Sequence, residues 1–155
     1  MQTSWSYSSE SAIPLPDPAM SALRAFIVED SPVILENLVV TLEEMANVEV
    51  VGSVSDEAAA VSWMSKDPQG GADLFIVDVF LRSGTGLGVL QAAQRLGVAA
   101  KRVVLTNYAT EDMRSRCTCL GAERVFDKSH QLDELISYCA DLAGTPSQPM
   151  PLLPR

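Results

Sequence analysis

The sequence predicts an α/β protein in which helices cover both faces of a five-stranded parallel sheet. Short, nearly continuous apolar runs such as Leu74–Val77 are typical of strands that are buried on both faces. These runs alternate with helix-like segments at short spacing, which is the pattern of successive β-α units with right-handed crossovers. Ligands of such sheets bind just beyond the carboxyl ends of the strands, so the residues that follow each run are the candidate functional residues.

The elements are expected in strict alternation. Ser31 is expected to cap the first helix, because Pro32 fits the first helical position, where its missing N–H costs nothing. A glycine-rich turn, residues 83–86, introduces the third helix, and Gly97 ends it. The expected strands are 23–28, 48–54, 73–78, 102–105 and 125–126, and the expected helices are 32–45, 56–66, 87–96, 111–120 and 131–142.

Helical spacing predicts which side chains face the sheet. In the first helix these are Ile34, Leu38, Leu42 and Met45. In the last helix they are Leu132, Leu135, Ile136 and Cys139.

Composition limits the class of protein. The 155 residues are 47% hydrophobic and 20% charged, which is typical of a globular domain, and no apolar run is long enough to span a bilayer. The formal net charge of -9 disfavours nucleic-acid binding. The start of the chain lacks the features of a secretory signal, so we expect a cytoplasmic protein without membrane or nucleic-acid partners.

Three regions differ in composition. Residues 1–21 are rich in Ser and Pro and are expected to form a flexible leader. Residues 144–155 are rich in Pro and are expected to form a disordered tail. Residues 22–143 are expected to fold as one domain. The three cysteines lie in predicted helices and lack the spacing of a metal site, so they are interpreted as buried or incidental thiols.

Polar side chains follow four of the predicted strands. Glu29 and Asp30 follow the first strand, Asp78 the third, Thr106 the fourth and Lys128 the fifth. Taken singly, each has an ordinary explanation as a turn, capping or surface residue. Together at one sheet edge, three carboxylates, a hydroxyl and an ammonium can hold a divalent cation and a phosphoryl group, and oxygen-only ligands suit Mg²⁺.

These residues resemble the receiver domain of response regulators in two-component systems, the CheY-like family. The resemblance covers residues 23–142, and four pieces carry it: Phe26–Pro32, Val77–Leu81 with Gly86, Val104–Tyr108, and Gly121-Ala122 leading to Asp127–Ser129. It implies a flavodoxin-like sheet with strand order 2-1-3-4-5. Receiver domains are a standard example of this order.

The resemblance also implies a chemistry. Asp78 would accept a phosphoryl group from the phosphohistidine of a sensor histidine kinase or phosphotransfer protein. Mg²⁺ would be held by Asp30, Asp78 and the backbone carbonyl of Phe80, with help from Glu29. Thr106 and Lys128 would bind the phosphoryl oxygens. Apart from its own phosphorylation and dephosphorylation, the protein would not be an enzyme.

The expected output is that of a single-domain regulator. Phosphorylation would remodel the surface formed by residues 111–142, which would bind a downstream protein, or the phosphoryl group would pass along a phosphorelay. Three positions depart from the family pattern. Glu29 replaces the commoner Asp, Ser129 replaces the usual Pro, and Val125 stands where many receivers carry an aromatic residue.

Other functions are compatible with parts of the sequence. The principal alternative is an adaptor that has the receiver fold without being phosphorylated. A phosphatase resembling haloacid dehalogenases would need an Asp at the position of Phe80, and a flavin protein would not place acids after the first strand. The glycine-rich segment 84–88 lacks the spacing of a dinucleotide loop and is interpreted as a turn, and His130 as a cap or surface residue.

Overall fold

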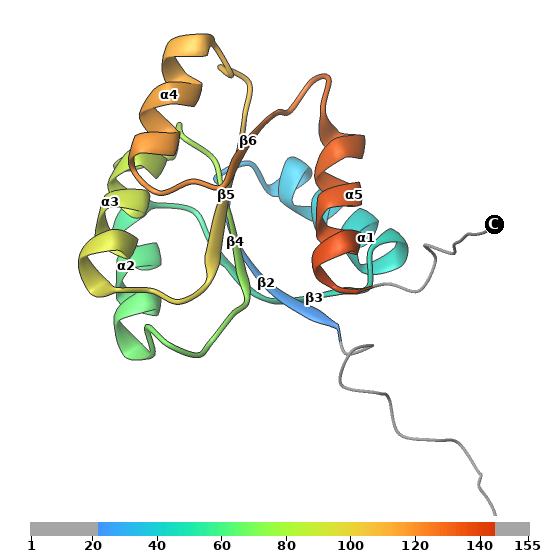
Figure 1. Ribbon diagram of the computed structural model, residues 1–155, viewed down its shortest axis with the longest axis horizontal. Coiled ribbons are helices and arrows are strands. Elements are labelled where there is room, and N and C mark those ends of the chain that lie inside the picture. Colours follow the sequence, from blue (N-terminus) through green and yellow to red (C-terminus); the bar gives the residue numbers. More distant parts are fainter. Residues whose placement is uncertain (1–21, 145–155) are drawn as a thin grey trace, which may run out of the picture.

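The computed structural model describes residues 22–144, which form a parallel sheet of five strands in the order β3-β2-β4-β5-β6 (Figure 1). Counted along the chain from the first strand, this is the predicted order 2-1-3-4-5. The strands are β2 (Leu23–Val28), β3 (Val48–Val54), β4 (Leu74–Val77), β5 (Lys101–Thr106) and β6 (Arg124–Asp127). The helices are α1 (Pro32–Met45), α2 (Glu57–Lys66), α3 (Gly86–Leu96), α4 (Glu111–Cys119) and α5 (Leu132–Leu142).

The predicted leader, residues 1–21, and the predicted tail, apart from Gly144, lie outside the described residues. Within residues 22–144, no helix is long and apolar enough to cross a membrane.

Helices cover both faces of the sheet, as predicted. Successive residues of a strand point to opposite faces, and β2 shows this alternation clearly. Ala25 and Ile27 pack into the core cluster that contains residues of α1 and α5, whereas Phe26 and Val28 pack into the cluster that contains residues of α2 and α3. In Figure 1, α1 and α5 accordingly lie on one side of the sheet, and α2, α3 and α4 on the other.

Local sequence signals fix the helix ends. The Ser31 hydroxyl accepts a hydrogen bond from the Ile34 N–H at 3.4 Å, and Pro32 begins α1 as expected. Thr85 caps α3 in the same way, with the Gly88 N–H at 3.1 Å from its hydroxyl. Gly97 ends α3 in the left-handed conformation, at φ 66°, which glycine adopts without steric cost.

Two residues predicted to face the sheet do not. Met45 is 66% exposed, because Ala46, one residue further on, takes the inward position at the end of α1. The helix instead packs on the core through Leu38 and Leu42. Leu132, the first residue of α5, is 36% exposed, while Leu135 and Cys139 are buried as expected. Helical periodicity continues to the last residue of a helix. The sheet surface that buries the helix does not extend so far, so residues at the helix termini can be exposed.

The three thiols differ in accessibility, which predicts their reactivity. Cys117 and Cys139 are buried, and burial raises the pKa of the Cys139 thiol to about 12. Cys119 is exposed. Since the thiolate is the reactive form, an alkylating reagent should modify Cys119 in the folded protein and the other two thiols only after unfolding. Peptide mapping after brief alkylation, with and without urea, measures this; rapid labelling of Cys139 without urea would contradict it.

Candidate functional site

The carboxyl edge of the sheet brings the predicted site residues into one pocket. Its walls carry Glu29 and Asp30 from the end of β2, Asp78 and Phe80 from the end of β4, Thr106 from the end of β5, and Lys128 from the end of β6. The pocket measures about 220 Å³, and Ser31, Ile34, Asn107 and Tyr108 complete its lining. Parallel strands end at the same edge, which is why residues distant in sequence meet there.

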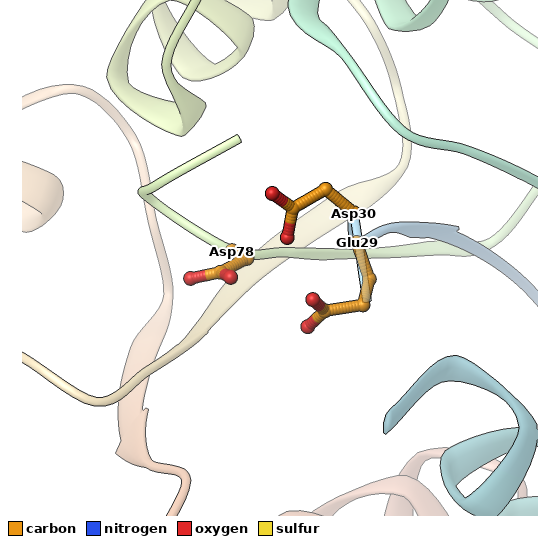
Figure 2. Close-up of side chains that lie close together, drawn as sticks. All are labelled: Glu29, Asp30 and Asp78. Atoms are coloured by element: carbon orange, nitrogen blue, oxygen red, sulfur yellow. The ribbon is translucent and has the colours of Figure 1, made fainter. Parts of the chain in front are cut away.

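Three carboxylates lie together in this pocket. Oxygen atoms of Glu29, Asp30 and Asp78 lie within 4.8 Å of one another. Figure 2 shows the three side chains gathered beyond the ends of their strands. Glu29 and Asp78 are buried, whereas Asp30 is exposed, so the cluster opens to solvent on the side of Asp30. Like charges this close repel one another unless a cation offsets them.

Lys128 supplies a positive charge to the cluster. Its Nζ lies 2.7 Å from Oε1 of Glu29 and 2.8 Å from Oδ2 of Asp78, and the lysine side chain is only 9% exposed. Burial by itself lowers the pKa of the ammonium group, but the hydrogen bonds to Asp78 and Glu29 and the negative charges of both carboxylates together outweigh burial, and the pKa of Lys128 is raised. The lysine is therefore a charged hydrogen-bond donor in direct contact with the Asp78 carboxylate.

Glu29 is the least exposed of the three acids. Burial raises the pKa of its carboxyl group, and the hydrogen bonds from Lys128 and from the Ser31 N–H, at 3.0 Å from Oε2, act in the opposite direction. The extra methylene of glutamate, relative to aspartate, allows this side chain to reach Lys128 while its other oxygen accepts from the backbone. Glu29 is thus part of an ion-pair network as well as of the acidic cluster.

Asp78 stands at the junction between β4 and the following loop. Its N–H donates to the Val28 carbonyl at 2.9 Å, which continues the pairing of β2 with β4 by one residue. Its Oδ1 accepts weakly from the Phe80 N–H at 3.4 Å. A Cβ at Gly86 would overlap the Asp78 carbonyl oxygen, so only glycine allows the start of α3 to approach the strand end so closely.

Thr106 is fully buried at the end of β5. Its hydroxyl oxygen accepts a hydrogen bond from the Tyr108 N–H at 3.2 Å. Its carbonyl accepts a hydrogen bond from the Lys128 N–H at 2.9 Å, so the end of β5 is bonded to the backbone of Lys128. Thr106 and Lys128 are therefore coupled through the backbone as well as through the shared pocket.

The two other departures from the family pattern have clear structural outcomes. No cis peptide bond occurs in residues 22–144, so the Lys128-Ser129 bond is trans. The Ser129 hydroxyl instead donates to the Asn107 side chain at 3.4 Å. Val125 and Phe126 pack into different core clusters, Val125 beside α3 and α4 and Phe126 beside α1 and α5, as predicted from the alternation of strand residues.

An aromatic pair at the pocket was not predicted. Phe80 and Tyr108 make an edge-on contact with their ring centroids 4.7 Å apart, and they are 49% and 58% exposed. Each stands two residues after a site residue, Asp78 or Thr106. From these sequence positions, both could have been predicted to lie at this edge of the sheet. His130 lies outside the pocket lining with its side chain 82% exposed, which agrees with its interpretation as a surface residue.

The ligand chemistry of the pocket fits Mg²⁺. Hard divalent cations prefer oxygen ligands, and the pocket offers three carboxylates, while Phe80, whose carbonyl is the further ligand that the family resemblance implies, also lines it. The solvent-open side at Asp30 leaves space for the waters that Mg²⁺ retains.

Comparison with known proteins identifies the family. The family model for the response regulator receiver domain matches residues 25–140. The chain is 28% identical over 141 residues to the alkaline phosphatase synthesis transcriptional regulatory protein SphR of Synechococcus elongatus, covering 87% of this chain and 54% of SphR. It is 26% identical over 114 residues to the uncharacterized transcriptional regulatory protein YvfU of Bacillus subtilis, covering 73% of this chain and 55% of YvfU. The chain thus spans about half the length of these curated relatives.

Solved structures show the same fold. A two-component response regulator of the LuxR family from Aurantimonas sp. SI85-9A1 has a TM-score of 0.71 and 20% identity, covering 79% of this chain and 86% of that chain. The isolated receiver domain of RcsB from Salmonella enterica serovar Typhimurium, solved with phosphomimetic BeF₃⁻, has a TM-score of 0.68 and 22% identity. The match covers 85% of this chain and 94% of that chain. The family match, strand order and acidic cluster agree, and the chain belongs to the response regulator receiver domain family, whose members are regulatory domains of two-component systems.

Proposed function

We propose that this receiver domain accepts a phosphoryl group on Asp78 from the phosphohistidine of a sensor histidine kinase or phosphotransfer protein. The contact that carries the proposal is the one between Lys128 Nζ and Asp78 Oδ2, at 2.8 Å in a pocket with two further carboxylates and the Thr106 hydroxyl. A buried carboxylate that is paired with one lysine and grouped with two acids fits a site for a dianionic phosphoryl group and a divalent cation.

In the proposed reaction, an Asp78 carboxylate oxygen attacks phosphorus while the bond from phosphorus to the imidazole nitrogen breaks. The electron pair of that bond remains on the imidazole. Lys128 offsets charge on the phosphoryl oxygens, and the Thr106 hydroxyl donates a hydrogen bond to one of them. Asp30, Asp78 and the Phe80 carbonyl, with Glu29 beside them, would hold Mg²⁺, which would supply charge stabilisation at the phosphoryl oxygens.

The proposed output surface comprises α4, β6 and α5, within residues 111–142. Arg114 of α4 joins these elements: its guanidinium donates to the carbonyl of Ala109 at 3.1 Å, to the carbonyl of Val125 at 2.7 Å and to the Gln131 side chain at 2.7 Å. Ala109 lies in the loop that follows Thr106. This side chain therefore provides a physical connection from the Thr106 loop to the output surface that requires no aromatic residue at Val125.

We propose two forms of output, binding of a downstream protein by this surface or transfer of the phosphoryl group along a relay. The cytoplasmic location also remains a prediction. The adaptor alternative is favoured only if Glu29 and Ser129 disable the pocket. Against it, Glu29 turns toward Lys128 and lies in the acidic cluster, and the trans Lys128-Ser129 bond leaves the lysine on Asp78.

Phosphotransfer from phosphoimidazole, which contains the same P–N bond as phosphohistidine, tests the proposal. With Mg²⁺ the intact mass should increase by one phosphoryl group. With EDTA the reaction should slow by about a hundredfold or more, because a metal ion contributes several kcal/mol of charge stabilisation. The adaptor alternative predicts no mass gain under either condition.

Mg²⁺ should also stabilise the fold without any phosphoryl donor. At roughly ten times its dissociation constant, a ligand of the native state adds about 1.4 kcal/mol, which for a domain of this size raises Tm by roughly 3 to 8 °C. Asp30→Asn removes one proposed ligand and should abolish most of this increase. Asp112→Asn, an exposed aspartate in the first turn of α4, is the matched control. An equal Mg²⁺ effect in Asp30→Asn would exclude this residue as a ligand.

A further inference from the structure

The loop between β4 and α3 contacts Glu57, the half-buried first residue of α2. The Glu57 N–H donates to the Ser83 carbonyl at 3.0 Å. In return, the Thr85 N–H donates to Glu57 Oε1 at 3.0 Å. One residue of α2 therefore holds the loop through both its backbone and its carboxylate.

Two glycines of the loop and of α3 make space for this side chain. A Cβ at Gly84 would overlap Cβ of Glu57, and a Cβ at Gly88 would overlap the Glu57 carboxylate. Gly84 also has φ 77°, which other residues rarely adopt. The glycine-rich segment that superficially resembles a dinucleotide loop is thus explained by close packing around Glu57.

The residue that Glu57 holds is paired with a residue of the pocket. Thr85 and Phe80 form an isolated antiparallel bridge across the loop. Phe80 lines the pocket, and its N–H points to Asp78 Oδ1 at 3.4 Å. The connection therefore runs from Glu57 to Thr85, from Thr85 to Phe80, and from Phe80 to the pocket of Asp78.

We propose that Glu57 is a positioning residue that fixes the backbone of Phe80 at the Mg²⁺ site by holding Thr85. The inference rests on the proposed function, in which the Phe80 carbonyl is a protein ligand of the ion. The carboxylate suits this role because it lies at the N-termini of α2 and α3, where helix dipoles favour negative charge.

Mg²⁺ titration followed by NMR of the backbone amides tests the inference in the full chain. Glu57→Ala should raise the Mg²⁺ dissociation constant about threefold to tenfold, the range expected for one lost hydrogen bond. The Thr85 amide should exchange with solvent about tenfold faster by the same reasoning. Glu57→Gln keeps the Oε1 acceptor but loses the charge, so both values should lie between those of wild type and Glu57→Ala. Glu44→Ala, which removes an exposed glutamate of α1, is the control and should change neither value.

Gly88→Ala separates positioning from stability. Alanine is a better helix former than glycine, and this gain offsets the hydrogen bond that Glu57 loses, so the Tm of this variant should stay close to that of wild type. Its Cβ nevertheless displaces the Glu57 carboxylate, so Mg²⁺ binding should weaken as much as in Glu57→Ala. The double variant should bind Mg²⁺ no more weakly than Glu57→Ala alone, since both changes break the same contact.

The outcomes distinguish the inference from the function on which it rests. If wild type and Glu57→Ala bind Mg²⁺ equally, Glu57 has no positioning role while the proposed function stands. If wild type binds no Mg²⁺, the proposed function and this inference fail together. Equal losses in Glu57→Ala and Gly88→Ala, with partial recovery in Glu57→Gln, establish the positioning role.

Discussion

Asp78→Asn is expected to abolish phosphoryl uptake from phosphoimidazole. An amide has no carboxylate oxygen to form the acyl phosphate, and Asp78 is the pocket carboxylate that stands at the end of the central strand β4, 2.8 Å from Lys128 Nζ. The fold should persist, because Asn matches Asp in shape and Lys128 keeps its ion pair with Glu29 at 2.7 Å. Intact mass and thermal unfolding of the same sample measure both expectations.

Asp73→Asn is the matched control for this experiment. Asp73 precedes β4 at the opposite end of the strand, and its Oδ2 accepts from the Arg24 N–H at 2.9 Å, a bond that the Asn side-chain oxygen preserves. This variant should take up one phosphoryl group as wild type does. Undiminished uptake by Asp78→Asn would assign the acceptor to another residue.

Lys128→Met should have the largest effect on stability. It leaves Glu29 and Asp78, whose side chains are 3% and 8% exposed, without their shared counter-charge. Removing one partner from a buried ion pair costs several kcal/mol, and we expect a loss of about 2 to 4 kcal/mol in unfolding free energy when EDTA is present. Mg²⁺ should recover part of the loss, because the ion offsets the same two carboxylates.

Urea denaturation of Lys128→Met in EDTA and in Mg²⁺ measures this difference. Phosphoryl uptake should also slow by about a hundredfold or more, since a preorganised charge aimed at the phosphoryl oxygens is lost. Lys101→Met, at the exposed start of β5, is the control and should leave stability and uptake nearly unchanged. A loss of stability that is the same in EDTA and Mg²⁺ would contradict a shared charge site.

Much of the fold is contained in local sequence patterns. The fully buried strand β4 is evident from its apolar run, and the start of α1 from Ser31 and Pro32, since both depend on neighbouring residues alone. The strand order is different: apolar runs do not record which strands pair, and the order came from family resemblance. The inward positions of Met45 and Leu132 were predicted wrongly, because periodicity does not show where a helix extends beyond the sheet.

For the site as well, some features could be predicted from the local sequence and others could not. That Asp78, Thr106 and Lys128 meet could be predicted, because parallel strands end at one edge and each residue follows a strand. Which atoms pair depends on side-chain reach and loop geometry. Lys128 contacts Glu29, and Glu57 accepts a hydrogen bond from Thr85. Both contacts join segments that are distant in sequence, and the local sequence does not specify how close these segments lie in space.

In the proposed function, one aspartate at the end of β4 carries the phosphoryl group. Wild-type protein phosphorylated by phosphoimidazole with Mg²⁺ and fragmented in the mass spectrometer tests it most directly. The phosphoryl group is predicted on Asp78. A phosphoryl group located on His130, or on any other residue, would contradict the claim.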